Sequence, residues 1–145
     1  MSPFLGIDFG TARIGLAVSD ELRLLAHPLE TISSKQDVVG RIASIVREKN
    51  IGRVVVGVPR RMSGELGAAA NETLRFVEKL RASLPCEVIT WDERWTTVAA
   101  NRALRDAGKK TRQTRAYVDQ VAAQMILQGY LDRQSDSAAA ERSSR

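Results

Sequence analysis

The chain has 145 residues, of which 43% are hydrophobic and 27% charged, and its formal net charge is +5 at pH 7. These values suit one domain of ordinary size, and because no apolar run approaches ~20 residues and no signal-peptide pattern opens the chain, we expect a soluble cytoplasmic protein. The only cysteine, Cys86, and the only histidine, His27, exclude an internal disulfide and a site built from Cys and His ligands.

Residues 3–20 form two short apolar runs separated by Gly10, a pattern that predicts a β-hairpin with strands at 3–9 and 14–20. Asp8 ends the first run and therefore lies at the rim of the hairpin. An Asp in this place is either a turn residue that bonds nearby backbone amides or a functional carboxylate, and the segment alone leaves both readings open. A third strand is expected at 23–32.

The middle of the chain alternates helices and strands. Apolar residues at helical spacing predict a helix over 37–49, with Asp37 as a suitable N-cap. A buried-type strand is predicted at 53–58, followed by a loop to about residue 66, a helix that ends at Leu84 and a strand at 86–91.

Asp92 and Glu93 follow that strand, at a junction where ligand sites of open α/β sheets collect. Successive side chains of a strand point to opposite faces, so only one of these two carboxylates should share a site with Asp8. The pattern leaves open which one.

Two helices are expected in the last third, at about 97–107 and 114–132. Asp119 breaks the pattern of the second helix, because it lies in the apolar sector with Ala122 and Ile126. A buried carboxylate needs a cation, a cluster of donors or a metal as partner. Arg115, one helical turn earlier, is the local candidate for an ion pair.

The element order βββαβαβαα predicts an α/β domain with a mixed five-stranded sheet and helices on its faces. We place this domain at residues 1–133. Residues 134–145 are mostly small and polar, which predicts a disordered C-terminal tail.

The positive charge is concentrated in one segment. Residues 1–93 carry equal numbers of basic and acidic side chains, whereas residues 94–115 carry seven basic side chains against one acid, Asp106. A polyanion such as nucleic acid would be drawn to this segment. Together with three further arginines, the candidates for contacts to phosphate are Arg13, Arg60, Arg61, Arg94, Arg102, Arg105, Lys109, Lys110, Arg112 and Arg115.

Several segments, in order, resemble the YqgF family of pre-16S rRNA nucleases, also described as Holliday junction resolvase-like. They are residues 6–10, 13–15, 56–59 with Gly64, 92–94 with 96–97, and 118–123 with 126–127. The resemblance spans about residues 3–132 and implies an RNase H-like fold, shared with the RuvC resolvases. Members of that family often carry a basic residue where this chain has Ala12.

The resemblance also implies a nuclease that matures the 5′ end of 16S rRNA, with an acidic site on Asp8, Glu93 and Asp119. It thereby favours Glu93 over Asp92. Three carboxylates are suitable ligands for Mg²⁺ or Mn²⁺, which would activate a water and stabilise the leaving oxygen in phosphodiester hydrolysis. The expected partner is precursor rRNA or a ribosomal precursor particle, with no membrane, and the chain is expected to be a monomer or a homodimer.

Three other functions fit parts of the sequence. A DNA nuclease acting on four-way junctions would use the same site and charge and would favour a dimer. A protein that binds RNA or the ribosome without cutting is also consistent with the charge. The run from Asp8 to Thr11 resembles the first phosphate loop of actin-like ATPases and sugar kinases, but those proteins need a second domain, for which 145 residues leave no room.

Overall fold

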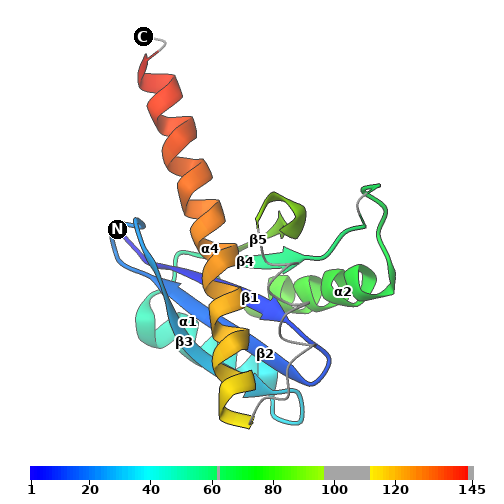
Figure 1. Ribbon diagram of the computed structural model, residues 1–145. Coiled ribbons are helices and arrows are strands. Elements are labelled where there is room, and N and C mark those ends of the chain that lie inside the picture. Colours follow the sequence, from blue (N-terminus) through cyan, green and yellow to red (C-terminus); the bar gives the residue numbers. More distant parts are fainter. Residues whose placement is uncertain (62, 97–111, 144–145) are drawn as a thin grey trace.

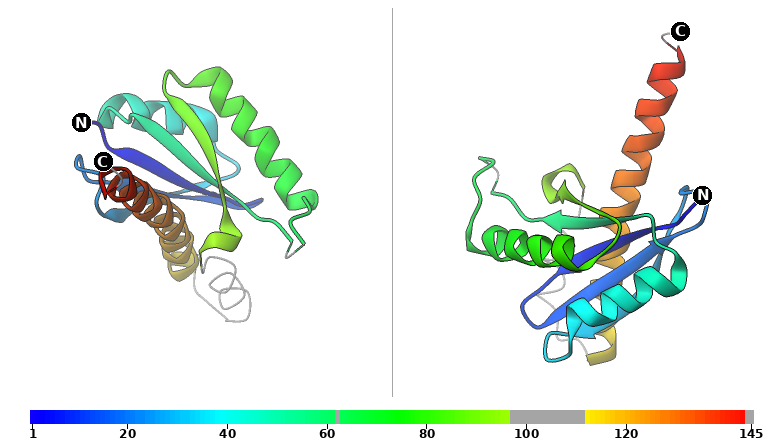
Figure 2. Two further views of the ribbon diagram at one scale, coloured as in Figure 1. Left: turned by 90° about the horizontal axis from the view of Figure 1, so that it is seen from above. Right: turned by 180° about the vertical axis from the view of Figure 1, so that it is seen from behind.

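The computed structural model describes residues 1–61, 63–96 and 112–143. A central five-stranded sheet has helices α1 and α2 on one face and the long helix α4 on the other, as the views in Figure 1 and Figure 2 show. None of the described helices combines the length and the apolar character that a membrane span requires.

The sheet contains β1 (Phe4–Phe9), β2 (Arg13–Ser19), β3 (Ala26–Ser33), β4 (Arg53–Val58) and β5 (Glu87–Asp92) in the order β3-β2-β1-β4-β5. The hairpin partners β1 and β2 are antiparallel, as are β2 and β3. Strand β4 is parallel to both β1 and β5. The prediction of a mixed five-stranded α/β sheet is therefore confirmed.

The helices are α1 (Val38–Lys49), α2 (Ala68–Ser83), the short 3-10 helix η1 (Glu93–Trp95) and α4 (Arg112–Ser143). Asp37 is the N-cap of α1, since its side chain accepts a hydrogen bond from the backbone N–H of Gly40. The helix predicted at 97–107 lies outside the described residues.

Each strand sends alternate side chains to two separate cores. Leu5 and Ile7 of β1 pack with α1 and α2, whereas Phe4 packs with α4. We call the side of the sheet that is covered by α4 the α4 face. Because the side-chain period of a strand is two, Gly6 and Asp8 also lie on the α4 face.

The start of β3 differs most from the sequence prediction, and the other strand boundaries agree with it to within one residue. Strand β3 begins at Ala26 rather than at residue 23, because Arg23 has φ +60° in a turn in which the Asp20 side chain accepts the N–H of Leu24. Strand β5 ends at Asp92, so Glu93 belongs to η1.

Helix α4 continues to Ser143 and projects past the sheet (Figure 1), where the sequence predicts a disordered tail; disorder of this segment stays a prediction. After Gly129 the chain has neither glycine nor proline to end a helix, and Ala138, Ala139 and Ala140 have high helix propensity. The domain boundary at residue 133 stays a prediction.

Candidate functional site

Asp8 lies on the α4 face near the end of β1, and its register partner on β2 is Gly15. On β4, Val56 pairs with Ile7, so Gly57 is the strand position beside Asp8 on the other side. Asp8 is therefore flanked by a glycine on each neighbouring strand.

Asp119 reaches this place because Gly15 has no side chain. A Cβ atom at Gly15 would lie 2.1 Å from the carbonyl oxygen of Asp119 and 3.0 Å from its Cβ. Helix α4 therefore touches β2 at the residue that pairs with Asp8. Asp119, which interrupts the apolar face predicted for this helix, therefore packs on Gly15, the β2 residue beside Asp8.

Glu93 lies on the other side of Asp8, toward β4. A Cβ atom at Gly57 would lie 2.7 Å from Oε1 of Glu93, so this carboxylate lies over β4 on the α4 face. Asp92 follows Trp91, which packs in the core under α4, and so occupies the opposite side of β5. The structure thus answers the question that the sequence left open: Glu93, not Asp92, shares a face with Asp8.

All three carboxylates are buried, with Asp8 3%, Glu93 2% and Asp119 4% exposed. Asp119 accepts a hydrogen bond from Nε of Arg13, with 2.6 Å between the nitrogen and Oδ2. This partner comes from β2, 106 positions away in the sequence, rather than from the local candidate Arg115. A charge-assisted bond of this length offsets much of the cost of burying Asp119.

The donor set suits a hard divalent cation, because carboxylate oxygens are the ligands that Mg²⁺ and Mn²⁺ prefer. In the described parts of the chain, however, no three acidic, histidine or cysteine side chains lie close enough together to hold a metal ion. The assignment of Asp8, Glu93 and Asp119 as metal ligands therefore stays a prediction.

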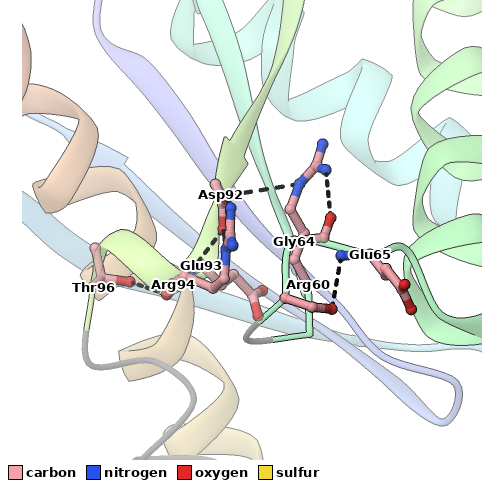
Figure 3. A network of polar contacts seen from close by, with 8 residues as sticks. Arg60, Gly64, Glu65, Asp92, Glu93, Arg94 and Thr96 are labelled. Carbon is pink, nitrogen blue, oxygen red and sulfur yellow. Dashed lines mark hydrogen bonds and ion pairs between the residues drawn. The ribbon is translucent and has the colours of Figure 1, made fainter.

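Asp92 is the centre of a second polar cluster at the end of β5 (Figure 3). Nε and Nη2 of Arg94 both donate to its carboxylate, the latter at 2.6 Å, and the backbone N–H of Arg94 donates at 3.0 Å. Nε of Arg60 lies 3.7 Å from the same carboxylate. The side-chain hydrogen bond from Arg94 lowers the pKa of Asp92 below its ordinary value and raises that of Arg94.

The loop after β4 closes over this cluster. Nη1 of Arg60 donates to the carbonyl oxygen of Gly64, and Gly64 has φ +90° with Nη1 of Arg94 only 3.3 Å from where a Cβ atom would lie. The positive φ of Gly64 is a backbone conformation that favours glycine, and a side chain there would also crowd Arg94. Asp92 and this loop hold two predicted phosphate contacts, Arg60 and Arg94, each with a side chain about one-third exposed.

A cavity of about 480 Å³ lies between the β2–β3 edge and the start of α4. We call it the basic groove; it is lined by Ala12, Arg13, Thr31, Ser33, Lys35, Gln36, Arg115 and Ala116. Arg13 and Arg115 were predicted as phosphate contacts, and Lys35 was missed. No motif marks Lys35, and only the packing of β3 against α4 brings it beside them.

The other predicted cations divide into two groups. Arg61 is exposed and lies near Glu65 in the loop after β4. Arg102, Arg105, Lys109, Lys110 and the side chain of Arg112 lie outside the described residues.

Comparison with known proteins identifies a family, related protein sequences and solved structures of similar fold. The model of the family RuvX, described as Holliday junction resolvase, matches residues 2–133. A protein of Acetivibrio thermocellus is 47% identical over 132 residues, which cover 88% of this chain and 94% of that protein. One of Halalkalibacterium halodurans is 43% identical over 134 residues, covering 90% and 96%. Both are named "Putative pre-16S rRNA nuclease".

Among solved structures, Thermus thermophilus RuvC in complex with a Holliday junction substrate matches with a TM-score of 0.58 and 16% identity, covering 92% of this chain and 97% of that one. The structure of T. thermophilus RuvC matches with a TM-score of 0.54 and 15% identity, covering 92% and 96%. At these identities the likeness concerns the fold, and it confirms the prediction of an RNase H-like architecture.

Proposed function

The chain belongs to the RuvX family, described as Holliday junction resolvase, and we propose that it is a divalent-metal-dependent endonuclease that processes the 5′ end of pre-16S rRNA in the cytoplasm. The names of its relatives support the substrate, and the acidic site supports the chemistry.

One observation carries the proposal: Asp8 has Asp119 beside it over Gly15 and Glu93 beside it over Gly57. Residues from β1, from η1 and from α4 thereby converge on one face. Three buried carboxylates on one face supply the oxygen ligands that a hard divalent cation prefers. Phosphodiester hydrolysis is the reaction in which such a site has a use.

In this proposal Asp8, Glu93 and Asp119 hold Mg²⁺ or Mn²⁺. When bound, the cation would supply an activated water and neutralise charge on the leaving oxygen. The protein's own part is positional: β1 fixes Asp8, η1 presents Glu93 over Gly57, and α4 fixes Asp119 over Gly15. Arg13 balances the charge of Asp119 and belongs to the basic groove.

Two surfaces would hold the phosphate backbone of the substrate. At one surface, Asp92 at the end of β5 orients Arg94, which follows it in η1, and Arg60 from the loop after β4. At the other, the basic groove presents Arg13, Lys35 and Arg115. Ala12 lines the same groove, so Lys35 supplies a positive charge close to the position at which the family often has a basic residue. Contacts of this kind position a strand without reading its sequence.

The test is a cleavage assay on three substrates: a pre-16S rRNA fragment that contains the 5′ processing site, an unrelated single-stranded RNA and a four-way DNA junction. Each is incubated with Mg²⁺, with Mn²⁺ and with a chelator. The variants are Asp8→Asn, Glu93→Gln and Asp119→Asn, with Glu78→Gln, an exposed acid on α2, as the matched control.

We expect metal-dependent cleavage of the rRNA fragment, reduced at least about a hundredfold by each of the three variants, equal to about 2.7 kcal/mol of transition-state stabilisation. Glu78→Gln should cleave like the wild type. Cleavage that survives the chelator would overturn the metal mechanism, preferred cleavage of the junction would favour the DNA substrate, and binding without cleavage would identify a non-enzymatic RNA-binding protein.

A further inference from the structure

A further concave region lies between η1 and the C-terminal half of α4, and the three carboxylates of the acidic site do not line it. It consists of two cavities of about 580 and 270 Å³ that share Trp91, Trp95 and Arg133 among their lining residues. We call the smaller one the Trp95 pocket; the rest of its lining is Thr90, Tyr130, Gln134 and Ser137. Neither the acidic site nor the two phosphate surfaces use these residues.

Trp95 is unusual for a tryptophan because it is 55% exposed. The guanidinium carbon of Arg133 lies 4.6 Å from its ring centroid, and Trp91 meets it at 5.1 Å between ring centroids with the rings nearly perpendicular. Exposed aromatic rings and arginine guanidinium planes are the surfaces on which unpaired bases stack. The pair thus offers stacking surfaces at the mouth of the pocket.

The lining chemistry excludes phosphate as the main ligand. Among the described residues that line the Trp95 pocket, Arg133 is the only charged one, and the remaining polar groups are hydroxyls and an amide. The larger cavity also presents Asp132 and Asp136, which would repel phosphate but accept hydrogen bonds from the amino groups of a base. A neutral, planar ligand with donors and acceptors on its edge fits this set.

We propose that the Trp95 pocket binds one unpaired nucleobase of the substrate strand. This inference depends on the proposed function for its substrate, a single-stranded region of RNA. Trp95 lies two residues after Glu93, so a strand that reaches the acidic site passes close to the pocket.

The chain provides its own reporter, because Trp91 and Trp95 are its only tryptophans and both line this pocket. The experiment is a titration of tryptophan fluorescence with a ten-nucleotide single-stranded RNA in the presence of a chelator, so that cleavage does not interfere. A second oligonucleotide of the same length, with abasic residues in place of nucleotides, keeps the phosphates and removes the bases.

We expect the intact RNA to quench the fluorescence and the abasic one to leave it nearly unchanged. Arg133→Gln, which keeps both tryptophans, should weaken binding about tenfold, as expected for the loss of one stacked base. Lys49→Gln, the same loss of charge on α1, is the matched control and should bind like the wild type. Trp95→Ala should weaken binding and Trp95→Phe should restore part of it, with binding measured by anisotropy of a labelled RNA.

Several results would overturn the proposal: equal quenching by the abasic strand, unchanged affinity in Trp95→Ala, or quenching by a ribosomal protein but not by RNA. A thermal melt of each variant checks the fold, and because Trp95 is mostly exposed, its replacement should change stability little. The result is separable from the cleavage assay, because quenching without cleavage refutes the nuclease but keeps the pocket, whereas cleavage without quenching does the reverse.

Discussion

The two faces of the sheet differ in the kind of residue that each strand sends to them. On the side of α1 and α2 the core is almost entirely aliphatic, with residues such as Leu5, Ile7 and Leu80 fully buried. On the α4 face the strands place glycines and Asp8 beneath a helix that carries Asp119. The same pleated strands thus build an aliphatic core on one side and, on the other, a second apolar core around Phe4, Trp91 and Ile126 that shares its face with the acidic site. We infer that the acidic site is confined to the α4 face, whereas both faces contribute to stability.

The largest effect on stability is expected on the α1 and α2 side, where Leu80→Ala leaves a cavity in the aliphatic core. The free energy of unfolding should fall by about 2–5 kcal/mol, measured by denaturant unfolding. Cleavage at a temperature well below the unfolding transition should remain near that of the wild type, because the carboxylates lie on the other face.

Leu80→Met is the control for this prediction, since it conserves volume and should cost less than about 1.5 kcal/mol. A loss of cleavage in Leu80→Ala beyond the fraction of unfolded protein would show that the two faces are coupled.

The aliphatic face is also the part that the sequence predicts best. Apolar strand runs and a helical stripe such as Ile42, Ile45 and Val46 are local patterns, and each one is enough to place its element. The start of β3 differs from the prediction by three residues because turn geometry at Arg23 determines it, whereas β5 is shifted by one residue and ends at Asp92, which caps η1.

The α4 face depends on contacts that no local pattern contains. The ion pair of Arg13 with Asp119 joins residues 106 positions apart, and the choice of Glu93 over Asp92 follows from which side of β5 packs under α4. The sequence predicted the three carboxylates as candidates from the strand ends, the helical pattern and a family resemblance. It could not predict that Gly15 and Gly57 let two of them approach Asp8.

An intermediate effect is expected for Gly15→Ala, which places a methyl group against the backbone of α4. The added Cβ would lie 2.1 Å from the carbonyl oxygen of Asp119, so the helix must move. We expect a loss of about 1–3 kcal/mol in the free energy of unfolding. Because the shift carries Asp119 with it, cleavage should fall much more than the loss of folded protein explains.

Gly67→Ala is the matched control, since its nearest neighbours are side-chain atoms of Arg61 at 3.4 Å or more and its φ is −90°. Because Gly67 is the N-cap of α2, where alanine is less favourable than glycine, the change should cost about 0.5–1 kcal/mol of stability and leave cleavage per folded molecule unchanged. If Gly15→Ala instead lowers stability and leaves cleavage per folded molecule intact, the close packing of α4 on β2 is not what positions Asp119.

The smallest effect concerns pH and compares two paired carboxylates outside the acidic site: Asp92, beside Glu93, and Glu30, beside α1. The pKa of Asp92 is lowered by its hydrogen bond from Arg94, and the pKa of Glu30 is lowered by its hydrogen bond from Arg41 of α1. A carboxylate whose pKa is lower in the folded state stabilises the fold above its unfolded pKa, about 4 for these groups, and loses that contribution as the pH falls through the folded value. Asp92→Asn and Glu30→Gln should therefore each flatten the fall in Tm between about pH 5 and pH 2.

For Glu30→Gln the change in Tm should be about 1–4 °C, the size expected for one partly exposed ion pair, and for Asp92→Asn, whose carboxylate is buried, the change should be larger. The two variants should differ in nucleic-acid binding. Asp92 orients Arg60 and Arg94 beside Glu93, so Asp92→Asn should weaken RNA binding at pH 7 and reduce its dependence on salt, whereas Glu30→Gln should leave both unchanged. Equal RNA binding by the two variants would mean that the cluster around Asp92 contributes to stability alone. The acidic site would then be the part of the molecule that acts on the substrate, and this cluster would belong with the rest of the scaffold.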